Sequence, residues 1–308
     1  MVPVALERLV IGVDVGGTKT LAAVVLRDGT IDGQVERVIT ECSSQESLLA
    51  QLDAMVEKLR AGREIAALGF GLPSRIDQPE GRVVASVNIP LEGVPFRDAM
   101  RERHGLPVGI DNDANVAAIA EWHAGAARGA RHVVMLTLGT GIGGGLILDG
   151  RPYRGATGSG AELGHIVIEY DGPECGCGGR GHLETFASGL VADAAASRLF
   201  GAGSTAVDLA EQAHAGNQEA VEAFAEIGRR LGAGIASFVN VFEPELVVVG
   251  GGFGAAGELL LGPAREVVAR EGLAPARDSV RIVEAQLGAE AGVIGAGMIA
   301  FEALEQAE

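Results

Sequence analysis

Three polar residues in a row, Asp111-Asn112-Asp113, lie where an apolar strand pattern at 107–111 runs into a helical pattern at 114–127. Asn and Asp are preferred caps of a helix N-terminus, so capping is one interpretation of this junction. A single residue is enough for a cap, however. An Asp at the end of a strand near a phosphate site is also well placed to accept a proton from an attacking hydroxyl. We therefore predict that an Asp of this junction acts as a general base.

A glycine-rich segment, Asp14-Val-Gly16-Gly17-Thr18-Lys19, separates strand patterns at 9–15 and 20–26. Glycines allow backbone N–H groups to face a phosphate, Thr18 adds a hydroxyl donor and Lys19 adds positive charge. Asp14 could be an oxygen ligand of hydrated Mg²⁺. The alternative is a plain hairpin turn. The spacing differs from the G-x-x-x-x-G-K-[ST] loop, so we predict another kind of phosphate hairpin.

A second glycine segment, Leu138-Gly139-Thr140-Gly141-Ile142-Gly143-Gly144-Gly145, contains G-x-G-x-x-G. A dinucleotide-binding loop must open a helix, whereas a strand pattern follows here at 146–148. We therefore expect a glycine turn over 139–145 and a second phosphate hairpin. Strand, glycine turn and strand thus occur at both 9–26 and 133–148, which is a coarse internal repeat that indicates two related lobes.

A third segment, Gly250-Gly251-Gly252-Phe253-Gly254, follows a strand pattern and is expected to open a helix, and Gly257 completes another G-x-G-x-x-G. This is the best candidate for a dinucleotide site, which would favour a nicotinamide-dependent enzyme. Only 24 residues follow Glu284, too few to complete a doubly wound sheet. We therefore expect this loop to contact adenosine at one end of a larger nucleotide cleft.

Four potential zinc ligands, His165, Cys175, Cys177 and His182, fall within eighteen residues among glycines. Cysteine thiolates and imidazoles bind Zn²⁺, and four of them complete a closed tetrahedral site. The alternative is a reduced Cys-x-Cys pair beside two ordinary histidines. A structural zinc would fix the segment that carries His165 and Glu184 and would take no part in the chemistry.

Composition limits the class of protein. The 308 residues suit two lobes, and a hydrophobic content of 47% allows a sizeable core. A net charge of −17 argues against nucleic acid as a partner. Three cysteines are too few for a disulfide scaffold. The N-terminus has no long apolar region, and other apolar runs are short, so we expect a cytoplasmic protein without a membrane partner.

Together these motifs resemble the ROK family, which includes bacterial glucokinases, fructokinases, N-acetylmannosamine kinases and sugar-responsive repressors. The resemblance runs from about Val10 to the C-terminus, with the motifs in the family's order. They are D-x-G-G-T-K at 14–19, N-D-A-N at 112–115, L-G-T-G-x-G-G-G at 138–145, A-E-L-G-H at 161–165, C-x-C-G-x-x-G-x-x-E at 175–184 and G-G-G at 250–252.

The resemblance implies an α/β fold of the actin-like ATPase (ribonuclease H-like) type, with two lobes and an interlobe cleft. Residues 1–115, with a C-terminal helix at about 290–308, would form the small lobe. Residues 116–289 would form the large lobe, with the zinc segment and nucleotide site. It further implies Asp113 as catalytic base. The sugar contacts would be Ser74, Asn88, Asn112, Asp113, Glu162, His165 and Glu184, and the ATP contacts Asp14, Gly16, Gly17, Thr18, Lys19, Gly139, Thr140, Gly141, Gly251 and Gly252.

This chain departs from the family pattern at two positions. Ser74 follows Pro73 where the family usually has Gly, and this loop would border the sugar, so the identity of the hexose is open. His182 stands where the family has Cys, although two His and two Cys remain a competent zinc set. Asn88 resembles an Asn of the family's sugar-side loop only weakly.

The expected function is therefore a hexose kinase that transfers the γ-phosphoryl group of Mg·ATP to a sugar hydroxyl, foremost O6 of glucose. N-acetylmannosamine, N-acetylglucosamine and fructose are alternative acceptors, and polyphosphate is an alternative donor. A non-catalytic sugar sensor is a further alternative, but family repressors carry a DNA-binding domain ahead of the first glycine loop, and only 13 residues precede Asp14. The resemblance implies a homodimer or homotetramer.

Overall fold

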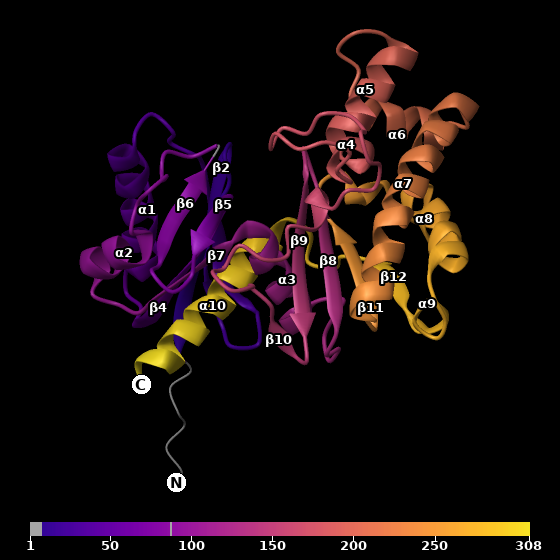
Figure 1. Ribbon diagram of the computed structural model, residues 1–308. Coiled ribbons are helices and arrows are strands. Elements are labelled where there is room, and N and C mark those ends of the chain that lie inside the picture. Colours follow the sequence, from indigo (N-terminus) through magenta and orange to yellow (C-terminus); the bar gives the residue numbers. More distant parts are fainter. Residues whose placement is uncertain (1–7, 87) are drawn as a thin grey trace. The chain divides into compact units, whose positions relative to one another are not determined.

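The computed structural model describes residues 8–86 and 88–308, which form two compact units (Figure 1). The first unit contains the described residues up to Arg128, together with Tyr153–Ala161 and Ala289–Glu308. The second contains Gly129–Pro152 and Glu162–Gly288. The sequence placed the first boundary at residue 115 and returned only the C-terminal helix to the first lobe. In the structure, residues 116–128 and 153–161 also group with the first unit.

The first unit is built on a five-stranded sheet in the order β3-β2-β1-β4-β7. Strand β1 is antiparallel to β2, and β2 to β3, whereas β4 and β7 run parallel to β1. Its strands are β1 (Leu9–Val15), β2 (Lys19–Val25), β3 (Ile31–Ile39), β4 (Ile65–Leu72) and β7 (Val108–Asn112), with a separate hairpin of β5 (Ser74–Asp77) and β6 (Arg82–Ser86). Its helices are α1 (Gln45–Arg60), α2 (Phe96–His104), α3 (Asp113–Ala124) and α10 (Ala291–Ala307).

The second unit repeats this sheet in the order β10-β9-β8-β11-β12. Again three strands form an antiparallel meander, and two further strands run parallel to the first of them. The predicted internal repeat is thereby confirmed. The strands are β8 (Val133–Leu138), β9 (Ile142–Leu148), β10 (Arg151–Pro152), β11 (Leu246–Gly250) and β12 (Arg281–Glu284). The helices are α4 (Glu184–Ala187), α5 (Gly189–Phe200), α6 (Ala206–His214), α7 (Gln218–Phe242), α8 (Glu258–Glu271) and α9 (Ala276–Ser279), with 3-10 turns η1 (Leu163–His165), η2 (Gly254–Ala256) and η3 (Gly288–Glu290).

Two sequence predictions about glycine segments were wrong. The turn predicted for 139–145 ends at Gly141, because Gly143, Gly144 and Gly145 are already part of β9 and pair with β8. The segment 250–254 does not open α8 directly. Instead it enters η2, and Gly257, at φ +58°, occupies the N-cap position directly before α8 begins.

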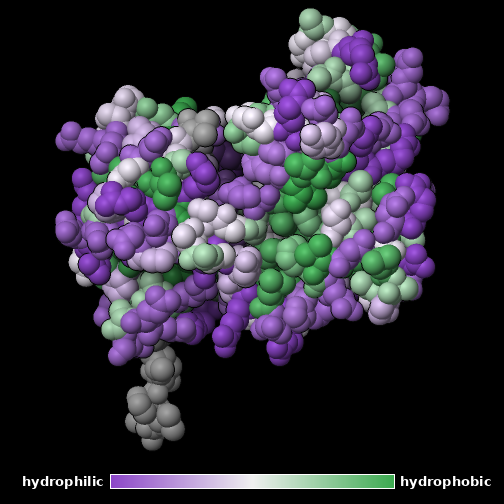
Figure 2. All heavy atoms as spheres, viewed as in Figure 1, coloured by the Kyte–Doolittle hydropathy of each residue, from purple (hydrophilic) through white to green (hydrophobic). Residues whose placement is uncertain are grey.

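The helices form where apolar residues recur at helical spacing. In α1, six apolar residues from Leu48 to Leu59 are buried, and Ser44 caps the helix by accepting a hydrogen bond from the amide of Ser47. The visible surface over α1 and α2 is largely hydrophilic (Figure 2), which fits helices that each bury one face. No helix in residues 8–86 and 88–308 is long and apolar enough to cross a membrane.

Helix α10 packs on the first sheet at unusually short range. Gly12, Gly69 and Gly109 occupy one row across the adjacent strands β1, β4 and β7. A Cβ at any of the three would overlap backbone atoms of α10. Figure 1 shows this helix, in yellow, lying against the first unit's sheet. The row of glycines therefore lets the helix backbone touch the sheet, and it fixes the start of α10 beside the first glycine hairpin.

Candidate functional site

At the junction of β7 and α3, helix capping and the predicted role as proton acceptor fall to two neighbouring residues. Asn112 caps α3, because its Oδ1 accepts hydrogen bonds from the amides of Ala114 at 3.0 Å and Asn115 at 3.3 Å. Its Nδ2 donates to Oδ1 of Asp113 at 3.0 Å. Asp113 itself is exposed. The capping interpretation thus applies to Asn112, which leaves the carboxylate of Asp113 oriented and accessible for chemistry.

The first glycine hairpin is a tight turn between β1 and β2. The amide of Gly16 donates to the carbonyl of Lys19 at 2.9 Å. Thr40, the residue after β3, stabilises this turn by two hydrogen bonds. Its amide donates to the carbonyl of Thr18 at 3.0 Å, and its hydroxyl donates to the carbonyl of Gly16 at 2.6 Å. Sequence reasoning missed Thr40, because nothing local to that residue indicates that it buries its hydroxyl under a loop more than twenty residues away.

Asp14 lies at the end of β1 in an unfavourable place for a negative charge. Burial, and after it the charge of Asp113, raise the pKa of its carboxyl to about 6, although Lys19 opposes both effects. The first unit therefore places Lys19 and Asp113 close enough to Asp14 for their charges to change its pKa, while the role of these residues at a phosphate and metal site stays a prediction. The excess negative charge at the two carboxylates suits a divalent cation with oxygen ligands.

Asn88 and Ser74 differ in their surroundings. Asn88 lies against the first hairpin, since a Cβ at Gly17 would come within 2.8 Å of the Asn88 Cβ. Ser74 is buried, and its hydroxyl donates to Ser86 at 2.9 Å, while its carbonyl oxygen accepts from Asn112 at 3.4 Å. In this structure Ser74 thus supports the junction, and contact of either residue with a sugar stays a prediction.

The second glycine hairpin, Gly139–Gly141, joins β8 to β9 and is held from two sides. The amide of Gly139 donates to the carbonyl of Gly141 at 2.9 Å, which closes the turn. The carbonyl of Gly139 accepts from the amide of Gly189, the first residue of α5, at 2.8 Å. The amide of Ile142 donates to Oε2 of Glu184 at 2.8 Å. The loop is therefore fixed by the N-terminal ends of α4 and α5.

The glycine loop after β11 packs on the same hairpin. Gly251, at φ +86°, approaches Leu138 so closely that a Cβ would overlap its backbone. The amide of Phe253 then donates to the carbonyl of Leu138 at 2.9 Å, and its ring stacks on Phe224. Within the second unit, the structure thus brings Gly251 and Gly252 next to Gly139–Gly141, which are the residues predicted to hold ATP there.

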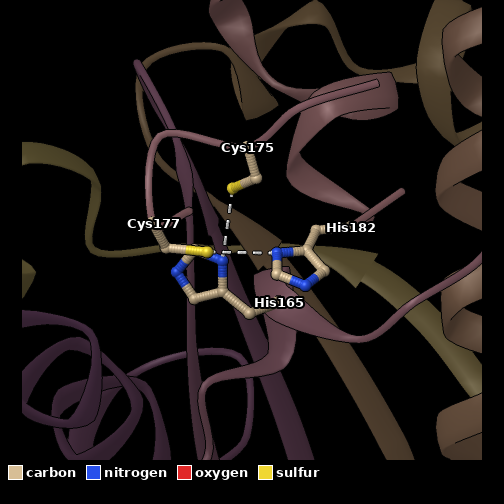
Figure 3. A group of neighbouring side chains, drawn as sticks. All are labelled: His165, Cys175, Cys177 and His182. Atoms are coloured by element: carbon tan, nitrogen blue, oxygen red, sulfur yellow. Dashed lines mark hydrogen bonds between the residues drawn. The ribbon is translucent and has the colours of Figure 1, made fainter. Parts of the chain in front are cut away.

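The four predicted zinc ligands converge. Figure 3 shows His165, Cys175, Cys177 and His182 pointing toward one another, and their ligand atoms all lie within 4.8 Å of one another. Sγ of Cys175 is 3.7 Å from Nδ1 of His165, and Sγ of Cys177 is 3.3 Å from Nδ1 of His182. These separations and this donor set fit a tetrahedral zinc ion. His182 occupies its place in the cluster although the family has Cys there.

Protonation of the cluster sets a condition on metal binding. Burial, and after it the side chains of nearby Cys177 and Glu184, raise the pKa of the Cys175 thiol to about 11. Without a cation the thiol is therefore protonated at neutral pH. A metal ion must displace that proton to gain a thiolate ligand, so binding at this cluster is coupled to proton release.

Three residues predicted to contact sugar lie on or beside this cluster in the second unit. Glu162 precedes η1 and is exposed. His165 directs Nδ1 to Cys175, which leaves Nε2 as its other polar atom. Glu184 is partly buried and joins two structures: Oε2 accepts from Ile142, and Sγ of Cys175 donates to Oε1 at 3.6 Å. The sequence did not predict this link between the metal cluster and the second hairpin.

Two repeated α/β sheets, each with a glycine hairpin between its first two strands, define the actin-like ATPase class, so the predicted fold is confirmed. The ROK family profile matches residues 10–303. The chain is 36% identical to a glucokinase of Streptomyces coelicolor, covering 96% of this chain and 98% of the relative. It therefore belongs to the ROK family, as its motifs indicated.

Solved structures agree with this assignment. The crystal structure of a ROK family glucokinase from Streptomyces griseus in complex with glucose and AMPPNP matches with a TM-score of 0.83 and 36% identity, covering 96% of this chain and 99% of that one. A ROK hexokinase from Thermus thermophilus matches with a TM-score of 0.84 and 35% identity, covering 97% and 99%.

Proposed function

We propose that this protein is an ATP-dependent glucose kinase. The observation that carries the proposal is the near-complete match to glucokinases, one of them solved with glucose and AMPPNP, in a chain that keeps an exposed Asp113 at the N-terminus of α3. A kinase needs a carboxylate that accepts the proton of the attacking hydroxyl, and Asp113 is exposed and oriented for this task.

We assign the other residues by the chemistry of phosphoryl transfer. The hairpins at Gly16–Thr18 and Gly139–Gly141 supply backbone N–H groups for the phosphates, and Lys19 adds charge. Asp14 is the candidate ligand for the Mg²⁺ that accompanies ATP, and this ion would neutralise developing charge on the phosphates. Asn112 and Glu162 are proposed to hydrogen-bond the sugar.

His165 has two tasks in this proposal. Nδ1 belongs to the zinc cluster, so Nε2 is the atom that remains for a sugar hydroxyl. Zinc bound by His165, Cys175, Cys177 and His182 would hold that ring in place from outside the reaction, and its binding is supported by the convergence of four suitable donors. The cytoplasmic location and the homo-oligomer stay predictions.

The test is a coupled assay of ADP release with Mg·ATP and a panel of glucose, mannose, fructose, N-acetylglucosamine and N-acetylmannosamine. Release that depends on glucose, with a kcat/KM above that of the other sugars, is the expected result. Release with another sugar alone would replace the substrate. A lack of sugar-dependent release from folded, zinc-replete protein would favour the sensor alternative.

The role of Asp113 has its own test. The variant Asp113→Asn keeps an Oδ1 that can accept the Ala114 amide, so the junction should stay folded. We expect kcat to fall by roughly 10²- to 10⁴-fold, since a general base contributes about that much. Glucose affinity, measured by calorimetry, should change little. Activity within tenfold of the wild type would refute the assignment.

A further inference from the structure

Arg154 makes an ion-pair network with the strand that leads to Asp113. Its Nε donates to Oδ2 of Asp111 at 2.5 Å, and its Nη2 donates to Oε2 of Glu302 in α10 at 3.0 Å. The side chain of Arg154 is only 25% exposed. Burial by itself lowers the pKa of this guanidinium, but Asp111 and Glu302 outweigh it and raise the pKa above the ordinary value. Arg154 is thus a fixed positive charge.

Asp111 transmits this contact to the junction. Its side chain is completely buried. Oδ1 accepts from the amide of Asn112 at 2.8 Å and from Nδ2 of Asn115 at 3.0 Å, so both oxygens are engaged. A buried carboxylate needs a paired charge, and Arg154 is the cation recorded next to it among the described residues. Arg154 thereby fixes the carboxylate that holds the first residues of the junction.

Asn112 completes the chain of contacts to Asp113. Its amide donates a hydrogen bond to Oδ1 of Asp111, its own Oδ1 caps α3, and its Nδ2 donates to Oδ1 of Asp113. Each link is a hydrogen bond between neighbouring groups. A shift of Asp111 would therefore move Asn112, the first turn of α3 and the carboxylate of Asp113 together.

The segment that carries Arg154 is itself tied to the first unit. The chain leaves the second unit after Pro152 and re-enters it at Glu162. Between them, the carbonyl of Thr157 accepts from the amide of Gln78 at 2.8 Å, and Nε2 of Gln78 donates to the carbonyl of Ile110 in β7 at 2.8 Å. Residues 153–161 thus reach the junction by two routes, and Arg154 is the only ionic one recorded among the described residues.

We propose that Arg154 is a positioning residue for the proposed kinase reaction: it holds the buried Asp111, which orients the cap residue Asn112 and the base Asp113. This inference rests on the proposed function, because it concerns the same base. Arg154 acts through Asp111 and Asn112, so it should affect the alignment of Asp113 and not the binding of ATP.

The test uses the full-length, zinc-replete protein and the variants Arg154→Gln and Arg154→Lys. We expect Arg154→Gln to lower kcat roughly 10- to 100-fold, the size of effect that a small misplacement of a reacting group produces, while KM for ATP stays within about twofold. Arg154→Lys keeps the charge but lacks the planar fork, so it should fall between this variant and the wild type. If Arg154→Gln does not fold, Arg154→Lys carries the comparison.

The matched control is Glu302→Gln, which removes the other ion pair of the same guanidinium and leaves the contact with Asp111. It should keep wild-type kcat. A second readout needs no turnover: hydrogen exchange at the amides of Ala114 and Asn115 should accelerate in Arg154→Gln and not in Glu302→Gln.

Two outcomes would overturn the proposal: unchanged kcat and exchange in both Arg154 variants, or an equal loss of kcat in Glu302→Gln. A wild-type protein without sugar-dependent ADP release would instead contradict the proposed function, and the exchange comparison would still decide whether Arg154 holds the junction.

Discussion

Gly292, in the first turn of α10, faces the carboxylate of Asp14 at the end of β1, and a Cβ at position 292 would overlap the Asp14 side chain. The position of Asp14 therefore depends on residue 292, which is far away in the sequence, having no side chain. Because we assign Mg·ATP to Asp14, the contact makes Gly292 a sensitive point for catalysis.

We expect Gly292→Ala to displace Asp14 and to lower kcat by about tenfold or more, because reacting and metal-binding groups tolerate little misplacement. Steady-state kinetics with varied Mg·ATP will measure the effect. Gly262→Ala in α8 is the control, since its Cβ would meet an atom no closer than 3.9 Å. Equal kcat in both variants would show that Asp14 adapts to the added methyl group.

The raised pKa of Asp14 predicts a pH-dependent loss of stability. Between the ordinary value of 3.8 and the folded-state value of about 6, the folded protein holds a proton at Asp14 that the unfolded chain has released. Stability therefore falls as pH rises through this window and stays low above it. A difference of about 2 between the pKa values corresponds to about 3 kcal/mol.

The variant Asp14→Asn removes this titration. Relative to the wild type, its free energy of unfolding should gain up to about 3 kcal/mol on going from pH 4 to pH 7. Urea unfolding of both proteins without Mg²⁺ or ATP, at several pH values across this range, provides the measurement. A difference between the two proteins that is constant with pH would contradict the predicted titration.

The glycine row beneath α10 predicts a strong effect on stability. Gly69→Ala would force the added methyl group into the carbonyl of Ala296, so the helix must move away from the sheet. We expect a loss of about 2–4 kcal/mol in the free energy of unfolding, in the range of severe steric substitutions. Gly262→Ala should cost less than this, because apart from the adjoining Pro263 its Cβ would meet no atom closer than 3.9 Å. Chemical denaturation compares the two.

The four-residue metal cluster predicts that zinc stabilises the second glycine hairpin, Gly139–Gly141. Elemental analysis should find about one zinc ion per chain, and Cys175→Ser should lose it. Because Glu184 lies between Cys175 and the amide of Ile142, loss of zinc should also speed hydrogen exchange at Ile142. Cys42→Ser is the control, since Cys42 lies outside the cluster. Full metal content in Cys175→Ser, or unchanged exchange at Ile142, would contradict the respective part of this prediction.

Local patterns predicted most of the fold. Strand β1 was predicted with its observed bounds, and the glycine turn expected after it lies between β1 and β2. These features depend on neighbouring residues, and so does the spacing that places Cys175 and Cys177 in one cluster. Helix α2 was missed because charged residues outnumber its three buried ones, Phe96, Met100 and His104, so its apolar stripe is short.

Contacts between distant residues could not be predicted. Arg154 and Asp111 are 43 positions apart, and no local pattern indicates that they pair. The predicted extent of the second glycine turn was wrong for a related reason. Gly143 to Gly145 have a low intrinsic preference for a strand, but pairing with β8 extends β9 over them. The residue roles that the family resemblance implied for the sugar stay predictions.

The glycine row also affects the order in which the chain can fold during synthesis. Strands β1, β4 and β7 leave the ribosome early, but the helix that covers their glycine-lined face is residues 291–307. The second unit is complete in sequence at Gly288 and can therefore form while this face is still bare. Synthesis of the first unit therefore starts before that of the second unit and ends after it. A nascent chain that stalls before residue 291 would present the uncovered face of the first sheet to chaperones and proteases.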